Sequence, residues 1–157
     1  MSISTSALIG VALDYTDTTP SFATGTTVNL NDGGQAVYVQ AASTVSTYMA
    51  VSVRVDNTVV PLTTTNSANS KAIGFAQVSI ASASYGWVQI GGKPRVTVAT
   101  ACQPNVPLFT TATAGVLDDA TVTAGLVAGL VATTSAASAS AVSCIAGYPH
   151  VLTGLNA

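Results

Sequence analysis

The chain has 157 residues, a mass of 15.5 kDa and a formal net charge of −2, and only 6% of its residues are charged. Four Lys and Arg residues are too few to neutralise a phosphate backbone, so a nucleic-acid partner is excluded. The 48% apolar content and the low net charge argue against a disordered chain, and the length suits one domain, or one domain with an arm.

The residue usage favours β-structure. Ala, Ser and Thr occur 26, 16 and 23 times, Val outnumbers Leu by 21 to 10, and Glu is absent. Residues branched at Cβ pack well in pleated strands, whereas most residues that build helix surfaces are missing. So few charges give little electrostatic protection against association, so we expect an oligomer or a partner that covers part of the surface.

The first 25 residues are predicted to form an extended arm. They contain one short apolar stretch, Ala7–Leu13, which predicts a short strand, followed by the irregular polar segment Asp14–Pro20. From Thr26 the strand signals become regular, and Thr26–Leu30 leads into Asn31–Gly34, where Asp-Gly favours a tight turn.

The clearest strand signal is the alternation of Met49, Val51, Val53 and Val55 with Ala50, Ser52, Arg54 and Asp56, which predicts a half-buried strand. Further strands are predicted at Ala36–Ala41, Val59–Leu62, Ile73–Ile80, Tyr85–Ile90, Arg95–Thr100, Leu108–Thr111, Val122–Ala132 and Ala139–Ala146. The last two carry small residues on both faces, as expected where strands pack closely or pair with another subunit.

About nine or ten short strands with frequent turns predict an all-β fold, an antiparallel barrel or sandwich over residues 26–157, preceded by the arm over residues 1–25. No repeat of equal period is visible in the sequence. Any helix is expected to be a single short turn near Leu117–Ala120. Residues 63–71 are polar and are predicted to form a loop.

Residues 1–5 lack the basic start of a signal peptide, so we expect synthesis in a reducing cytoplasm. There Cys102 and Cys144 are expected to be buried free thiols rather than a disulfide, and their spacing excludes a CxxC motif. Residues 124–147 are rich in Ala, Val and Gly, but Ser and Thr interrupt them repeatedly, so we reject a membrane span.

The residues that could carry chemistry do not form a recognisable site. His150 is the only His and no nucleophile elbow accompanies it, and Asp118 and Asp119 are adjacent, so on a strand they point to opposite faces. Asp14 and Asp17, with Thr16 and Thr18, match no calcium-binding loop. Trp87 is better explained as a structural aromatic than as a platform for a sugar. We therefore predict no catalytic, cofactor or metal site, and no enzyme.

Four stretches, in this order, resemble small structural proteins of tailed phages that serve as capsid decoration or cement proteins. They are Gly33–Ala41, Ile73–Val78 with Tyr85–Ile90, Cys102–Asp119, and the small-residue ending up to Tyr148–Pro149. The resemblance covers roughly residues 26 to 149. It implies a β-rich protein on the exterior of the virion head that bridges capsomers of the major capsid protein, often as a trimer or a dimer.

This role fits the physics of the chain. Many weak contacts that bridge capsomers give avidity against internal DNA pressure, and an extended arm over residues 1–25 could add a strand to a partner's sheet. Two alternatives stay open. One is a receptor- or glycan-binding module, which requires exposed aromatics grouped with Asp, Asn or Gln, and no such cluster is clear among the nine aromatics. The other is a different virion subunit, in the tail or neck.

Overall fold

The computed structural model describes residues 11–121 and 125–152, and the predicted all-β class is confirmed. These residues form thirteen strands and no α-helix. The strand number exceeds the predicted nine or ten because β1 (Thr16–Asp17), β8 (Gly91–Gly92) and β11 (Leu117–Asp118) are two-residue strands, too short to show an alternating pattern.

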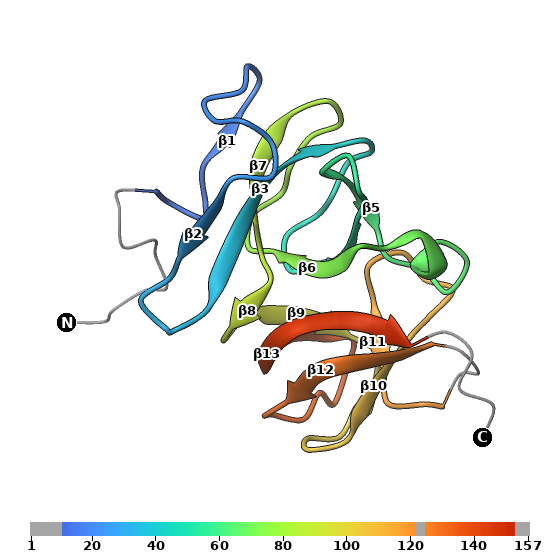
Figure 1. The fold of residues 1–157 in the computed structure, drawn as a ribbon. Helices are drawn as coiled ribbons and strands as arrows, with labels where there is room; N and C mark the ends of the chain where they lie inside the picture. Colours follow the sequence, from blue (N-terminus) through green and yellow to red (C-terminus); the bar gives the residue numbers. More distant parts are fainter. Residues whose placement is uncertain (1–10, 122–124, 153–157) are drawn as a thin grey trace.

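Five strands close into a first barrel in the upper half of Figure 1. The strands are β3 (Gln35–Ala41), β4 (Ala50–Val53), β5 (Thr58–Pro61), β6 (Ala72–Ala76) and β7 (Tyr85–Gln89). They pair in the order β3-β5-β4-β6-β7, and β7 pairs back to β3. The β3–β5 pair is parallel and the other pairs are antiparallel. Two short strands flank this ring, β1 beside β7 and β2 (Thr27–Asn29) beside β3.

A second ring of five strands forms the lower half of Figure 1. It contains β9 (Arg95–Val98), β10 (Pro107–Thr110), β11, β12 (Leu126–Ala132) and β13 (Ser140–Leu152). The order is β9-β11-β10-β12-β13, and β13 pairs back to β9. Again a single pair, β9–β11, is parallel. The predicted antiparallel barrel therefore becomes two barrels, each with one parallel pair.

The two barrels are a structural repeat, with β3 to β7 matching β9 to β13 in order. The ladders match residue for residue: Val39 faces Gly86 as Val96 faces Val142, and Val53 faces Val59 as Thr110 faces Leu117. The backbone hydrogen bond from Ala42 N to Val59 O (2.9 Å) recurs from Ala99 N to Leu117 O (2.8 Å). Positive φ angles recur as well, at Tyr48 and Asn105 and at Asn57 and Gly115.

A trace of this repeat remains in the sequence between Ser79–Gly91 and Ser135–Gly147. Both segments contain Ala-Ser-Ala-Ser after the same spacing from Ser79 or Ser135, and both end in Gly. The statement that no repeat is visible is therefore corrected by the structure. The repeat is masked because β12 contains a bulge between Ala128 and Leu130 that β6 lacks, and because most core positions differ between the barrels.

Branched apolar side chains fill the first barrel, as the alternation at Met49–Val55 predicts in part. Val51 and Val53 lie inside it with Val37, Val39 and Val59. Ala50 and Ser52 on the other face are also buried, so β4 is a fully buried strand rather than a half-buried one. Val55 lies beyond the end of β4 and is 82% exposed, which corrects its assignment to the buried face.

The outer face of β4 and β6 is buried because the second barrel packs on it. Ala50, Leu62, Ile73 and Phe75 share one core with the interior of the second barrel. The turn at Gly115 enters this interface, where its carbonyl accepts from Ala50 N (3.0 Å) and its N–H donates to Leu62 O (2.8 Å). The two barrels are thus joined by both apolar packing and backbone hydrogen bonds.

Helical structure occurs at a different place from the one predicted. Residues 117–118 form β11, whereas one 3₁₀ turn, η1 (Ser67–Asn69), lies in the predicted polar loop. Asn66 organises this loop, since its Oδ1 accepts from Thr63 N (2.9 Å) and its Nδ2 donates to Pro61 O (2.8 Å). The described residues contain no helix long and apolar enough to cross a membrane.

Residues 11–25, the described part of the predicted arm, pack on the outer face of the first barrel. Leu13 is buried with Leu30, Tyr38 and Trp87, and Thr16 and Asp17 pair with Gly86 and Tyr85 of β7. The strand expected at Ala7–Leu13 lies mostly outside the described residues, and its described end, residues 11–13, is not in a strand.

Candidate interaction surfaces

The residues singled out from the sequence do not come together at one place in the fold: His150, the Asp118–Asp119 pair and Asp17 with Trp87 lie in three different regions. His150 is exposed on β13, and its Nδ1 is 3.5 Å from Tyr148 O. It borders a groove of about 400 Å³ between the barrels, together with Lys71 and Tyr148. Asp118 and Asp119 lie in the second barrel, where Asp118 Oδ1 accepts from Asp119 N (2.8 Å) and Asp119 Oδ2 accepts from Gln103 N (2.9 Å). Asp119 therefore links the end of β11 to the loop that precedes β10.

The carboxylates near the N-terminus are separated as well. Asp14 is exposed, whereas Asp17 accepts a hydrogen bond of 2.7 Å from the Tyr38 hydroxyl. Over residues 11–121 and 125–152 no three His, Cys, Asp or Glu side chains gather as metal ligands do.

The two cysteines lie in the core of the second barrel, buried and unpaired, as predicted. Burial, with a small contribution from the nearby Cys102, raises the pKa of the Cys144 thiol to about 12. Burial also raises the pKa of Cys102, and the carboxylates of Asp119 and Asp118 add to this shift. Neither thiol has the lowered pKa of a nucleophile, so both are packing residues.

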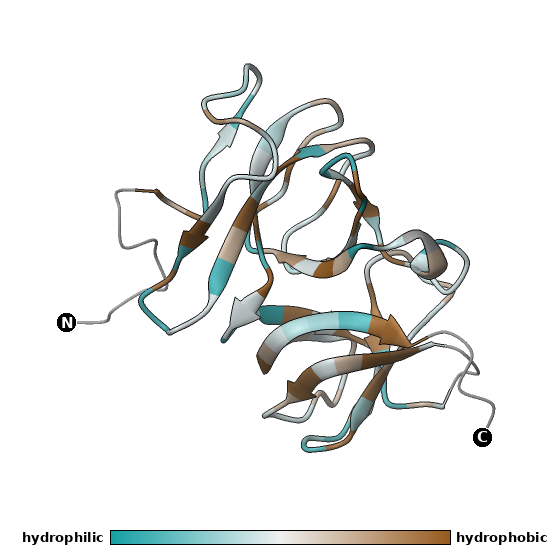
Figure 2. Cartoon of the chain, viewed as in Figure 1, coloured by the Kyte–Doolittle hydropathy of each residue, from teal (hydrophilic) through white to brown (hydrophobic). Residues whose placement is uncertain are grey.

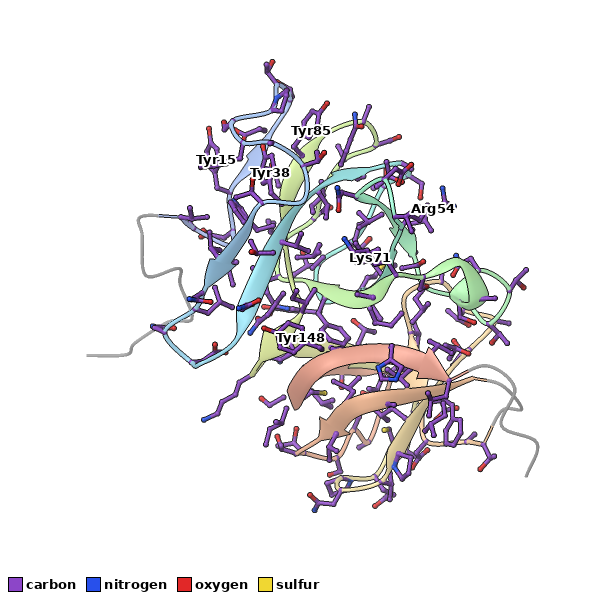
Figure 3. All side chains as sticks on the ribbon, viewed as in Figure 1. Tyr15, Tyr38, Arg54, Lys71, Tyr85 and Tyr148 are labelled. Carbon is purple, nitrogen blue, oxygen red and sulfur yellow. The ribbon has the colours of Figure 1, made fainter. Side chains whose placement is uncertain are left out.

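Four aromatics form a cluster that the sequence did not reveal. Tyr38 and Trp87 lie at ring centroids 5.1 Å apart, Tyr85 stacks on Tyr38 at 6.1 Å, and Phe22 meets both Tyr38 and Trp87 edge-on at 5.4 Å. Figure 3 shows Tyr15, Tyr38 and Tyr85 gathered beside β1. The statement that no aromatic cluster is clear is thereby corrected. Trp87 is only 2% exposed, so its ring packs inside the protein, in agreement with a structural role.

The second barrel carries a surface on β12 and β13 whose side chains are uncharged, and we call it the β12–β13 face. It is defined by the outward side chains of Val131, Thr133, Ser143 and Ile145. After Asp119 the chain contains no Asp, Glu, Lys or Arg. Figure 2 shows the brown and pale colours of apolar and weakly polar residues along β12.

The centre of this face is apolar. Val131 and Ile145 are partners across the β12–β13 ladder, and they are 42% and 55% exposed. Thr133 and Ser143 continue the same ladder, where Thr133 N and Thr133 Oγ1 both donate to Ser143 O, at 2.8 and 2.9 Å. Beyond this face, Tyr148 at the bulge has φ 49°, is 57% exposed and lines the groove between the barrels.

Such a face suits contact with another protein surface. Cores of protein interfaces are depleted in charged residues and enriched in aromatic and apolar ones, with polar groups at the rim. The Val131–Ile145 pair supplies the apolar centre, and the Thr133 and Ser143 hydroxyls supply a polar rim. Beyond Ser143 the face ends at its ladder partner Arg95, which is exposed. The sequence predicted this property in part, from the small residues and the lack of charge in the last two strands.

Comparisons with protein-family models and with curated proteins found no match to the chain.

Proposed function

We propose that this chain is a capsid decoration, or cement, protein of a tailed phage, which bridges neighbouring capsomers of the major capsid protein on the exterior of the head. The observation that carries the proposal is the β12–β13 face, an uncharged surface with the exposed pair Val131 and Ile145 at its centre. The ordered resemblance of four stretches to such proteins supplies the location on the capsid.

The construction of the molecule supports this role. The two barrels share a core and are joined by backbone hydrogen bonds at Gly115, so a load applied to one barrel is transmitted to the other. A rigid body that contacts two capsomers gains avidity, because the second contact forms at a high effective concentration. In this proposal the β12–β13 face contacts the shell.

The same proposal includes self-association, with a homotrimer favoured over a dimer. Only 6% of the residues are charged, so identical surfaces can approach without strong repulsion. Assembly takes place in the host cytoplasm. The strand that residues 1–25 are expected to add to a partner's sheet is not supplied by residues 11–25, because these residues pack on their own barrel. Residues 1–10 lie outside the described residues.

The direct test is binding of the purified protein to heads of the native phage that lack it, measured by co-sedimentation. Ile145→Lys places a charge at the centre of the β12–β13 face, and we expect affinity to fall about tenfold or more. Val55→Lys is the matched control, because Val55 is exposed on the first barrel, and it should bind as the wild type does.

Three results would contradict the proposal. Equal binding of wild type and Ile145→Lys would remove the β12–β13 face from the contact. Localisation of the chain to the tail or neck by electron microscopy of the native virion would establish the alternative virion role. A monomer in light scattering at micromolar concentration would contradict the homotrimer.

A further inference from the structure

The first barrel carries a pocket of about 400 Å³ that the β12–β13 face does not involve. We call it the aromatic pocket and define it by the side chains that line it: Val11, Tyr15, Asp17, Ser21, Phe22 and Trp87. It lies where residues 11–22 cross the outer face of β7. The pocket is thus built from the described part of the predicted arm together with the barrel beneath it.

Two of its aromatic side chains remain accessible. Tyr15 is 62% exposed and Phe22 is 43% exposed, although large apolar side chains usually bury most of their surface. Phe22 is held in place by its edge-on contacts with Tyr38 and Trp87, both at 5.4 Å. Phe22 therefore presents a pre-positioned ring surface, and little of its side-chain entropy is lost when a ligand contacts it.

A carboxylate lies in the same wall. Asp17 Oδ2 accepts the hydrogen bond from the Tyr38 hydroxyl at 2.7 Å, and Ser21 N donates to that hydroxyl at 3.2 Å. These bonds fix the position of the carboxylate. A carboxylate has two oxygens and about four acceptor positions, so one hydrogen bond leaves it able to accept more from a ligand.

The surroundings of the pocket are acidic. Asp14 and Asp17 lie on either side of Tyr15 in the chain, and no Lys or Arg occurs before Arg54. In Figure 3, Arg54 and Lys71 lie near β5 and β6, away from Tyr15, Tyr38 and Tyr85. A ligand that enters the aromatic pocket therefore meets a negative potential.

The fold does not need these aromatics. In the second barrel the positions equivalent to Tyr38, Tyr85 and Trp87 are Arg95, Ala141 and Ser143, and that barrel closes with the same strand order. Packing of residues 11–30 accounts for the buried rings of Tyr38 and Trp87. It does not account for the exposed rings of Tyr15 and Phe22.

We propose that the aromatic pocket binds an Arg or Lys side chain presented by a partner protein. The cationic group would lie against the rings of Tyr15 and Phe22 and donate to Asp17, while the aliphatic part of the side chain would contact Val11 and Trp87. Aromatic faces attract cations, and a carboxylate adds a charge-assisted hydrogen bond. A sugar would need several polar partners, whereas most of the residues that line the pocket are apolar or aromatic and Asp17 is the one charged group among them.

The test is an NMR titration of the full ¹⁵N-labelled chain with Nα-acetyl-arginine methylamide. The matched ligand is Nα-acetyl-citrulline methylamide, which has nearly the same shape and no charge. We expect shifts in the signals of residues 15–22 and in the Trp87 indole with the arginine compound, and binding at least tenfold weaker with the citrulline compound.

Two variants complete the test. Asp17→Asn keeps an oxygen that can accept from Tyr38 and removes the charge, and it should weaken arginine binding about tenfold. Tyr15→Ala removes an exposed ring and should weaken binding about two- to fivefold. Equal binding of the two ligands, shifts confined to other surfaces, or unchanged binding by Asp17→Asn would each overturn the proposal.

A glycan is the remaining outcome that would overturn it. If a neutral oligosaccharide shifted the same signals and the arginine compound did not, the aromatic pocket would be a carbohydrate site. The proposal does not depend on the capsid assignment, because the titration uses the isolated chain. Head binding by Ile145→Lys tests the capsid assignment, and arginine binding by Asp17→Asn tests the aromatic pocket, so either proposal can fail while the other stands.

Discussion

The two barrels share a strand order and a set of ladders, but they differ in what covers them. Inside, apolar residues stand at equivalent positions: Val39 and Val96, Val51 and Leu108, and Val59 and Leu117 are all buried. Outside, the first barrel carries the aromatic cluster and its acidic surroundings, whereas the second carries the uncharged β12–β13 face. Apolar residues at equivalent core positions therefore suffice for closure of each ring of strands, whereas the outer faces of the two barrels carry different residues.

This difference assigns separate roles to the two halves. The topology tolerates Val88 in one barrel and Cys144 at the equivalent position in the other, and also Ile80 against Ala136. Small apolar residues of several sizes therefore fill such a narrow barrel. Functional proposals for this chain consequently rest on surfaces, with the β12–β13 face on one barrel and the aromatic pocket on the other.

The largest change in stability is expected at one of two equivalent turns, Gly115 in the second barrel and Asn57 in the first. Gly115 has φ 72°, and a Cβ there would lie 2.5 Å from Met49 Cγ, at the joint between the barrels. We expect Gly115→Ala to lower the free energy of unfolding by about 3 kcal/mol, from left-handed backbone strain and overpacking. Urea denaturation followed by Trp87 fluorescence measures it.

Asn57→Gly is the matched change. Asn57 also has positive φ, 60°, but its turn lies away from the joint, and glycine adopts this angle without strain. We expect a change within about 0.5 kcal/mol. If Gly115→Ala changed the free energy of unfolding as little as Asn57→Gly, this would contradict the close packing of Gly115 against Met49.

The sequence predicted the all-β class and the strands with clear alternation, such as β3, β4, β7 and β9, because a two-residue period is a local property. It could not predict ring closure, which depends on pairing between residues as distant as Ala36 and Gln89. The two-residue strands also have no local signature. The repeat was hidden by the bulge in β12, which breaks the spacing between otherwise matching segments.

The two surfaces were predictable to different degrees. The small residues on both faces of the last two strands can be seen in the sequence, and they led to the expectation that these strands pack closely or pair with another subunit. The aromatic pocket could not be seen, because Trp87 is far from Tyr15 and Phe22 in the chain and meets them only when residues 11–25 fold back on β7. The one available signal was that Tyr85 and Trp87 point to the same side of a strand.

The second test concerns the core thiol of the second barrel. The pKa of Cys144 is raised from 9.0 to about 12, so the protonated thiol is favoured by folding. This stability is present in full below pH 9 and is lost as the pH rises from about 9 to 12, because the unfolded chain ionises first. At pH 10 we expect the loss to be about 1 kcal/mol.

Cys144→Val gives the second barrel the same residue type that the first barrel has at the equivalent position, Val88. The free energy of unfolding of the variant should fall less than that of the wild type between pH 8 and pH 10 in urea denaturation. An identical pH dependence in the two proteins would show that the Cys144 thiol is not buried in the core.

The smallest change in stability is expected in the Ala-Ser-Ala-Ser loops that occur in both barrels. Ala83 has φ 64° and its N–H donates to Ala41 O (2.8 Å), whereas Ala139 is not among the described residues with positive φ. Ala83→Gly relieves left-handed strain of about 1–2 kcal/mol at the cost of chain entropy of about 0.4–1 kcal/mol, so we expect a gain of about 0.5 kcal/mol. Ala139→Gly relieves no strain and should lower the free energy of unfolding by a similar amount.

Thermal unfolding of the two single variants measures these changes, and we expect the midpoint temperature to rise for Ala83→Gly and to fall for Ala139→Gly. A shift of the same sign in both would mean that the two loops share one backbone conformation, and the repeat would then extend further into the loops than the angles indicate.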